Sequence, residues 1–173
     1  MRKLYSVFAA ISKAFAAISF AGVFIGVIFV VVDVVMRYLF DYPIPGDYDI
    51  TQLWLSVIVF SSLAYVQVEK GHIGVNMALK AMPPKVALSL FGVGTLIGSF
   101  TCGMCAFSCY KLAARALARN MVSMMANIPL FPFEYFEAIC MALLCIVMLL
   151  DAIQCFMALG DKEAADQIRN TWV

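Results

Sequence analysis

The sequence has little charge. Only 13% of its 173 residues are Asp, Glu, Lys or Arg, whereas 64% are hydrophobic. Soluble globular domains carry about 25% charged residues, so the composition excludes an ordinary water-soluble protein. The loops between apolar runs are also too short to fold as separate domains.

Histidine is scarcer still, because His72 is the only one in the chain. A membrane haem bundle needs axial histidines on facing helices, so haem binding is excluded. The chain also lacks a nucleotide-binding loop, a nucleophile elbow and zinc-ligand spacing. We therefore expect no cofactor, no metal site, no enzymatic activity and no nucleic-acid partner.

Long uncharged runs are what the sequence does have. They occupy residues 14–32, 50–68 and 86–110, and a fourth apolar run from about 133 to 157 contains three acidic residues. A helix needs about 20 apolar residues to cross a bilayer. The runs predict an all-α membrane protein, a single integral membrane domain over 1–173, with helices at about 14–38, 50–68, 86–119 and 133–157.

The distribution of lysine and arginine predicts the orientation. With a cytoplasmic N-terminus, most bases lie inside: Arg2, Lys3, Lys13, Lys70, Lys80, Lys85, Lys162 and Arg169. Four lie outside: Arg37, Lys111, Arg115 and Arg119. We expect both termini in the cytoplasm, no cleaved signal, and a short interfacial segment at 73–82 that breaks at Pro83 and Pro84.

The first predicted helix carries two motifs. Gly22 and Gly26 are spaced for close approach of another helix backbone. Asp33 and Arg37 are four residues apart, with the acid first, so they are expected to pair within the helix. The alternative is an ion or proton site, since charges inside membranes are often functional.

The turn after this helix contains Pro43, Pro45 and Gly46, which end the helix and reverse the chain. Asp49 or Thr51 is expected to cap the second helix. Trp54 then lies near the outer membrane interface, which indole rings favour.

The third predicted helix has one small face, formed by Gly94, Gly98 and Cys102 and continued by Cys105 and Cys109. Such faces, like the glycine pair at 22 and 26, are predicted to pack against a neighbouring polypeptide. Residues 86–119 would span about 51 Å, so this helix tilts or projects.

Its end carries a basic stripe, Lys111, Arg115 and Arg119, with four-residue spacing. Three interpretations stay open. The bases snorkel to lipid phosphates, dock an acidic partner, or pair with Glu134 and Glu137 of the fourth helix.

The cysteines offer an enzymatic alternative. Cys102 and Cys105 form a C-x-x-C motif, and Cys140 and Cys145 lie at similar depth. A four-helix thiol–quinone oxidoreductase would use such pairs, but a thiolate is disfavoured in hydrocarbon. A stand-alone small exporter is the third class, although no predicted span is broken mid-membrane as transporter sites usually require.

Three segments together suggest a family. "RYLFDYPIPGDYDIT", "VFSSLAYVQ" and "GHIGVN" resemble, in order and spacing, the small membrane subunit of tripartite ATP-independent periplasmic (TRAP) transporters, the DctQ type. The matching positions are Arg37, Tyr38, Phe40, Pro45, Gly71, His72, Ile73 and Val75. Asp49 stands where glutamate is usual, and Asn76 where aspartate is usual.

The resemblance implies a bacterial inner-membrane subunit of a sodium-coupled organic-acid transporter. Its partners would be a large elevator-type membrane subunit (DctM type), a periplasmic binding protein (DctP type) and membrane lipids. The small subunit would brace the static scaffold of the large one. A second hypothesis, drawn from the basic stripe, is that Lys111, Arg115 and Arg119 help to dock the binding protein. His72 would belong to a cytoplasmic turn, with a protonation role as the alternative.

Overall fold

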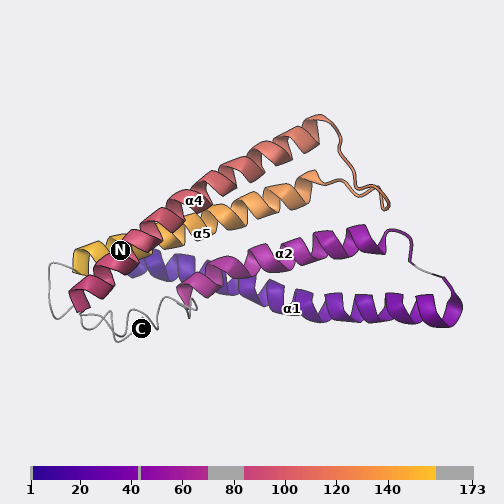
Figure 1. The fold of residues 1–173 in the computed structure, drawn as a ribbon, viewed down its shortest axis with the longest axis horizontal. Coiled ribbons are helices and arrows are strands. Elements are labelled where there is room, and N and C mark those ends of the chain that lie inside the picture. Colours follow the sequence, from indigo (N-terminus) through magenta and orange to yellow (C-terminus); the bar gives the residue numbers. More distant parts are fainter. Residues whose placement is uncertain (1, 43, 70–83, 159–173) are drawn as a thin grey trace.

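A computed structural model describes residues 2–42, 44–69 and 84–158 (Figure 1). Its helices are α1 (Arg2–Phe40), α2 (Asp47–Val68), α4 (Pro84–Ala118) and α5 (Phe131–Ala158). All four are long and apolar enough to cross a membrane. The prediction of an all-α protein with four membrane-spanning helices is therefore confirmed. The predicted interfacial segment at 73–82 lies outside the described residues.

The first helix is longer than predicted. It begins at Arg2 and contains 39 residues, about 58 Å at 1.5 Å per residue, whereas we expected a start near Ala14. The prediction followed the uncharged run and stopped at Lys13. That side chain is exposed, so one charge there does not interrupt the helix. A helix this long must tilt in the membrane or project from it.

The second helix begins at Asp47, and the predicted cap at Asp49 or Thr51 is wrong. Its N-cap is Gly46, which has a left-handed backbone (φ 78°) and makes no side-chain cap bond. A β-carbon at Gly46 would lie 2.7 Å from the Ala126 β-carbon. Glycine is therefore required at this position both by backbone conformation and by close packing.

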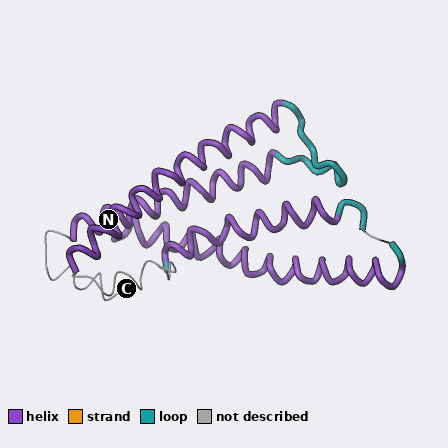
Figure 2. The backbone as a smooth tube through the Cα atoms, viewed as in Figure 1, coloured by secondary structure: helices purple, strands orange, loops and turns teal. Residues whose placement is uncertain are grey.

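The helices form two hairpins, α1–α2 and α4–α5. On the right of Figure 1 they run in the order α4, α5, α2, α1, and Figure 2 shows the two connections at that side. We call this side the loop end; it contains the α1–α2 turn and residues 119–130. Contacts between α2 and α5 join the hairpins, while α1 touches α5 only slightly.

The core lies between the hairpins and is built mainly by α5. Met141, Leu143 and Leu144 are buried with Ala64 of α2, and Phe8 and Phe15 of α1 pack against this cluster. The other face of α1 is open; for example, Phe24 is 72% exposed. Apolar side chains thus cover the outside as well as the centre, as in a protein surrounded by lipid or by another membrane subunit.

Candidate functional site at the loop end

A charged triad ties α1 to the start of α2. Arg37 Nη2 donates to Asp33 Oδ2 and to Asp47 Oδ2, each at 2.8 Å. Asp33 Oδ1 also accepts the backbone N–H of Ile44 at 3.2 Å. The intrahelical pair expected at Asp33 and Arg37 therefore forms. Sequence reasoning missed Asp47, although an acid just beyond a proline–glycine turn was the available signal.

Asp49 joins the two hairpins. Its Oδ2 accepts the backbone N–H groups of Met125 at 2.7 Å and of Ala126 at 2.9 Å, more than 70 residues along the chain. The side chain is buried, and Gly46 contacts the same Ala126. Two hydrogen bonds to one carboxylate are stronger than neutral ones. The start of α2 is thereby fixed against the loop between α4 and α5.

That loop is itself well structured. Val122 and Pro129 form an antiparallel bridge, and Ser123 N–H donates to the Ile128 carbonyl at 2.9 Å. Its tip is apolar and open, because Met124 is 99% exposed and Met125 67%. The loop therefore presents two methionines on a backbone that is held in place from α2.

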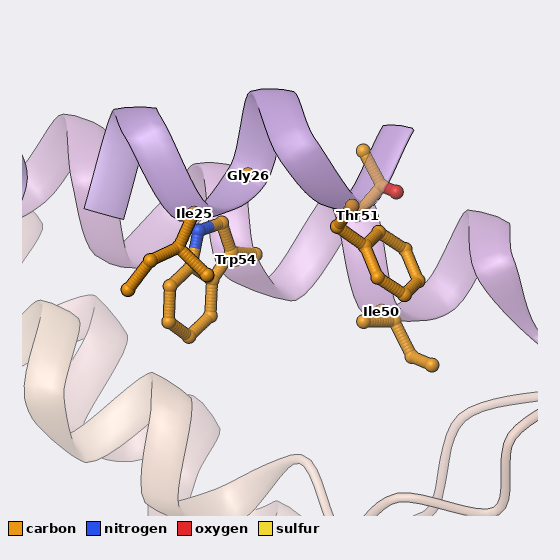
Figure 3. Close-up of a pocket in the computed structure, with 6 residues that line it drawn as sticks. Ile25, Gly26, Ile50, Thr51 and Trp54 are labelled. Carbon is orange, nitrogen blue, oxygen red and sulfur yellow. The ribbon is translucent and has the colours of Figure 1, made fainter. Parts of the chain in front are cut away.

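The glycine pair of α1 packs within the chain. Trp54 of α2 donates its indole N–H to the Gly22 carbonyl at 2.8 Å. A β-carbon at Gly26 would lie 3.0 Å from Trp54 Cδ1. Figure 3 shows the Trp54 ring beside Gly26, in a recess of about 200 Å³ that Ile25, Ile50 and Thr51 also line. The prediction that these glycines face another polypeptide is therefore wrong.

The small face of α4 also packs internally, but only in part. A β-carbon at Gly98 would lie 2.7 Å from Met148 Cε, and Cys102 Sγ lies 3.8 Å from Met148 Sδ. Gly94 has nothing within 4 Å of such a β-carbon. The expected contact therefore exists at two of the three positions, with α5 of the same chain, and Gly94 is not part of it.

The thiols gain no support as a redox site. No disulfide joins any of the six cysteines, all of which lie in the described part of the chain, and Cys140 and Cys155 are buried. Cys145 lies opposite Ser99, whose hydroxyl donates to the Cys145 carbonyl at 3.0 Å. These are packing contacts between α4 and α5. Among the described residues, no group of three or more His, Cys, Asp or Glu could hold a metal ion.

The basic stripe is exposed along its length. Lys111 Nζ lies 4.4 Å from the centroid of the Phe107 ring, and Arg115 Nε donates to the Lys111 carbonyl at 3.3 Å. Within the described part of the chain, no base of the stripe forms an ion pair with Glu134 or Glu137. The predicted pairing of the stripe with these acids therefore does not occur as a direct ion pair, although Arg115 and Glu134 interact electrostatically.

The acids of α5 have other surroundings. Glu137 Oε1 accepts a hydrogen bond from the Ser56 hydroxyl of α2, which adds a second link between the hairpins. Glu134 is half-buried near the start of α5. At the opposite end of the bundle, Gln67 Nε2 donates to Asp151 Oδ2 at 2.7 Å, and both residues are fully buried.

The remaining family-motif residues divide into two groups. Tyr38, Phe40 and Pro45 are exposed at the loop end. The motif after α2 lies outside the described residues, and it comprises Gly71, His72, Ile73, Val75 and Asn76.

Two membrane-spanning hairpins, tied at the loop end by a charged triad and by Asp49, define a small multi-pass membrane protein. Residues 26–158 match the family model of tripartite ATP-independent periplasmic transporters, DctQ component. The match covers most of the sequence, so the chain belongs to the DctQ family and is a transporter component. No curated protein and no solved structure matches it.

Proposed function

We propose that this chain is the small membrane subunit that braces the large subunit of a sodium-coupled TRAP transporter for an organic acid. The observation that carries this proposal is the open face of α1. Side chains on one side of that helix are all more than half exposed: Phe20, Phe24, Val27, Val31 and Tyr38. The opposite side of α1 packs on α2 through Gly22 and Gly26.

A brace must be rigid, and the polar groups of this bundle support that role. The carboxylates of Asp33, Asp49 and Asp151 all accept hydrogen bonds within the chain. These hydrogen bonds join the helices and loops of the bundle to one another. An elevator-type transporter needs one part held fixed while another slides. Substrate and sodium would therefore bind to the other components, and this chain would widen the fixed scaffold.

Co-purification with the large subunit tests the bracing role. Replacing Phe20 and Phe24 with alanine removes two large side chains from the proposed contact, and we expect recovery of the large subunit to fall about tenfold or more. Leu90→Ala with Ile139→Ala is the control, because these residues are exposed on α4 and α5. Equal recovery with both double variants would contradict the α1 contact.

The loop end would receive the periplasmic binding protein. Among the three residues of the basic stripe, Arg119 is the one best placed to contact the binding protein. It follows the last residue of α4 and adjoins the loop that carries Met124. A partner with acidic residues around an apolar recess would complement both the Arg119 guanidinium and the Met124 side chain. This arrangement needs the loop end outside the cell and both termini in the cytoplasm, which a reporter fused to the C-terminus would test.

Stimulation of transport by the binding protein measures this docking. Arg119→Gln should weaken stimulation most at low ionic strength, because salt screens exposed charges. Met124→Ser should weaken it equally at all salt concentrations. If both variants respond to the binding protein as the native chain does, the loop end is not its docking surface.

A further inference from the structure

An apolar groove runs along the outside of the α4–α5 hairpin. Its volume is about 700 Å³, within the range of about 300–1,000 Å³ that is typical of ligand pockets. Phe100 and Phe107 are 71% and 59% exposed along it. The lining residues are mostly aliphatic or aromatic, and the groove is open along its length: Leu96, Ile97, Phe100, Met104, Phe107 and Leu149.

Positive charge stands at one end of this groove. Lys111 follows Phe107 by four residues, about 6 Å along the helix axis, and its ammonium lies over the Phe107 ring. Arg115 follows by another turn, exposed and anchored through its Nε to the Lys111 carbonyl. In the described part of the chain neither base forms an ion pair with Glu134 or Glu137, although Arg115 interacts electrostatically with Glu134. Both basic residues are exposed, so a ligand outside the bundle can reach them.

We propose that the groove binds an anionic phospholipid, with an acyl chain along α4 and α5 and the phosphate at Lys111 and Arg115. Hydrocarbon matches the lining, and the phosphate matches two cations placed one turn apart where the apolar surface ends. A transmembrane helix of another subunit would fill the apolar part but would have to place acids at the depth of both bases. The site stands on this geometry alone and does not depend on the proposed bracing role.

Lipid retained by the purified full-length chain tests the site. The chain is exchanged into nanodiscs of phosphatidylcholine doped with phosphatidylglycerol, extracted in mild detergent and examined by native mass spectrometry. Lys111→Gln should weaken retention of phosphatidylglycerol about fivefold, and Lys111→Gln with Arg115→Gln about twenty-five-fold. Lys13→Gln, an exposed charge elsewhere on the bundle, is the matched control and should retain phosphatidylglycerol normally.

A second pair of variants tests the groove without changing charge. Gly103→Leu adds a side chain to the groove lining, beside Cys145 Sγ at 3.4 Å from its β-carbon, and should lower phosphatidylglycerol retention. Gly94→Leu, whose β-carbon has no atom within 4 Å, should not. Inorganic phosphate should not displace the lipid, because it lacks the acyl chain.

Three results would overturn the proposal. The charge variants could retain phosphatidylglycerol as the native chain does, or phosphatidylcholine could be retained equally well. Alternatively, Gly103→Leu could reduce recovery of the large subunit with no change in lipid retention, which would make the groove a protein interface.

Discussion

The two hairpins are held together by different means. In α4–α5, contact runs along the helices through small and sulfur-containing side chains such as Gly98, Cys102 and Met148. In α1–α2, a tryptophan sits on a glycine pair and a charged triad closes the loop end. In the α1–α2 hairpin, the tryptophan contact and the triad can each be removed by a single substitution, and one face of α1 is exposed.

The links between the hairpins differ from both. Besides the apolar core, polar links join the hairpins at three depths: Asp49 with the 119–130 loop, Ser56 with Glu137, and Gln67 with Asp151. Apolar contacts between helices gain little from the hydrophobic effect inside a membrane, because lipid is equally apolar. Specific hydrogen bonds thus fix which faces of the two hairpins meet.

Removing the most buried of these links, Gln67 with Asp151, should cause the largest loss of stability. Gln67→Leu removes the amide donor from a buried carboxylate and should destabilise the chain by about 1.5–3 kcal/mol. Titration with a denaturing detergent measures the unfolding. Gln52→Leu, an exposed glutamine in the same helix, should change stability by less than about 0.5 kcal/mol. If adding Asp151→Leu to Gln67→Leu restores no stability, the pair does not act as a unit.

Disrupting the contact between Gly26 and Trp54 should cause the second-largest loss of stability. Gly26→Leu places side-chain atoms against Trp54 and should lower the free energy of unfolding by about 1–3 kcal/mol through overpacking. A β-carbon at Gly94 has no atom within 4 Å, so Gly94→Leu should cause no such clash. Both substitutions add the same helix propensity, so the difference between their unfolding midpoints isolates the clash. Identical midpoints would show that α1 and α2 do not pack as described.

Loss of the Asp49 contacts should act locally. Asp49→Ala leaves two loop N–H groups without their carboxylate, so the loop should open more often, and tryptic cleavage after Arg119 should become about tenfold faster or more. Asp49→Asn should give a smaller increase, because the charge is lost but an acceptor stays. Asp41→Asn, whose exposed side chain lies in the α1–α2 connection, serves as the control and should be cleaved at the native rate.

Substitutions in the triad of Asp33, Arg37 and Asp47 should cause the smallest losses of stability. Asp33→Asn should lower the melting temperature more than Asp47→Asn, because the Asp33 side chain is 9% exposed and that of Asp47 is 28%. The change caused by Asp47→Asn should shrink as salt is added, since exposed ion pairs are screened. An equal and salt-independent loss in both variants would contradict this ranking.

The spans of the bundle were predictable because a bilayer sets the length of an uncharged helix. Their ends were less so, since Lys13 is tolerated on an exposed face and α1 extends to Arg2. The Asp33–Arg37 pair followed from spacing within one helix. Its third member, Asp47, lies across a turn, where spacing gives no geometry.

The contacts between hairpins were not predictable from sequence. Asp49 bonds to backbone N–H groups of Met125 and Ala126, and such groups are present at nearly every residue, so no side chain marks them. Gly22, Gly26 and Gly98 were correctly identified as sites of close approach, but sequence cannot say which helix approaches. Their partners are Ile58, Trp54 and Met148 of the same chain.

Transport by reconstituted vesicles tests the central claim most directly, namely that this chain supports a transporter and conducts nothing alone. Vesicles that contain only this chain should accumulate no organic acid under a sodium gradient. Vesicles with the large subunit and binding protein should do so, and should lose most of that uptake when this chain is omitted. Uptake by the chain alone, or undiminished uptake without it, would contradict the account.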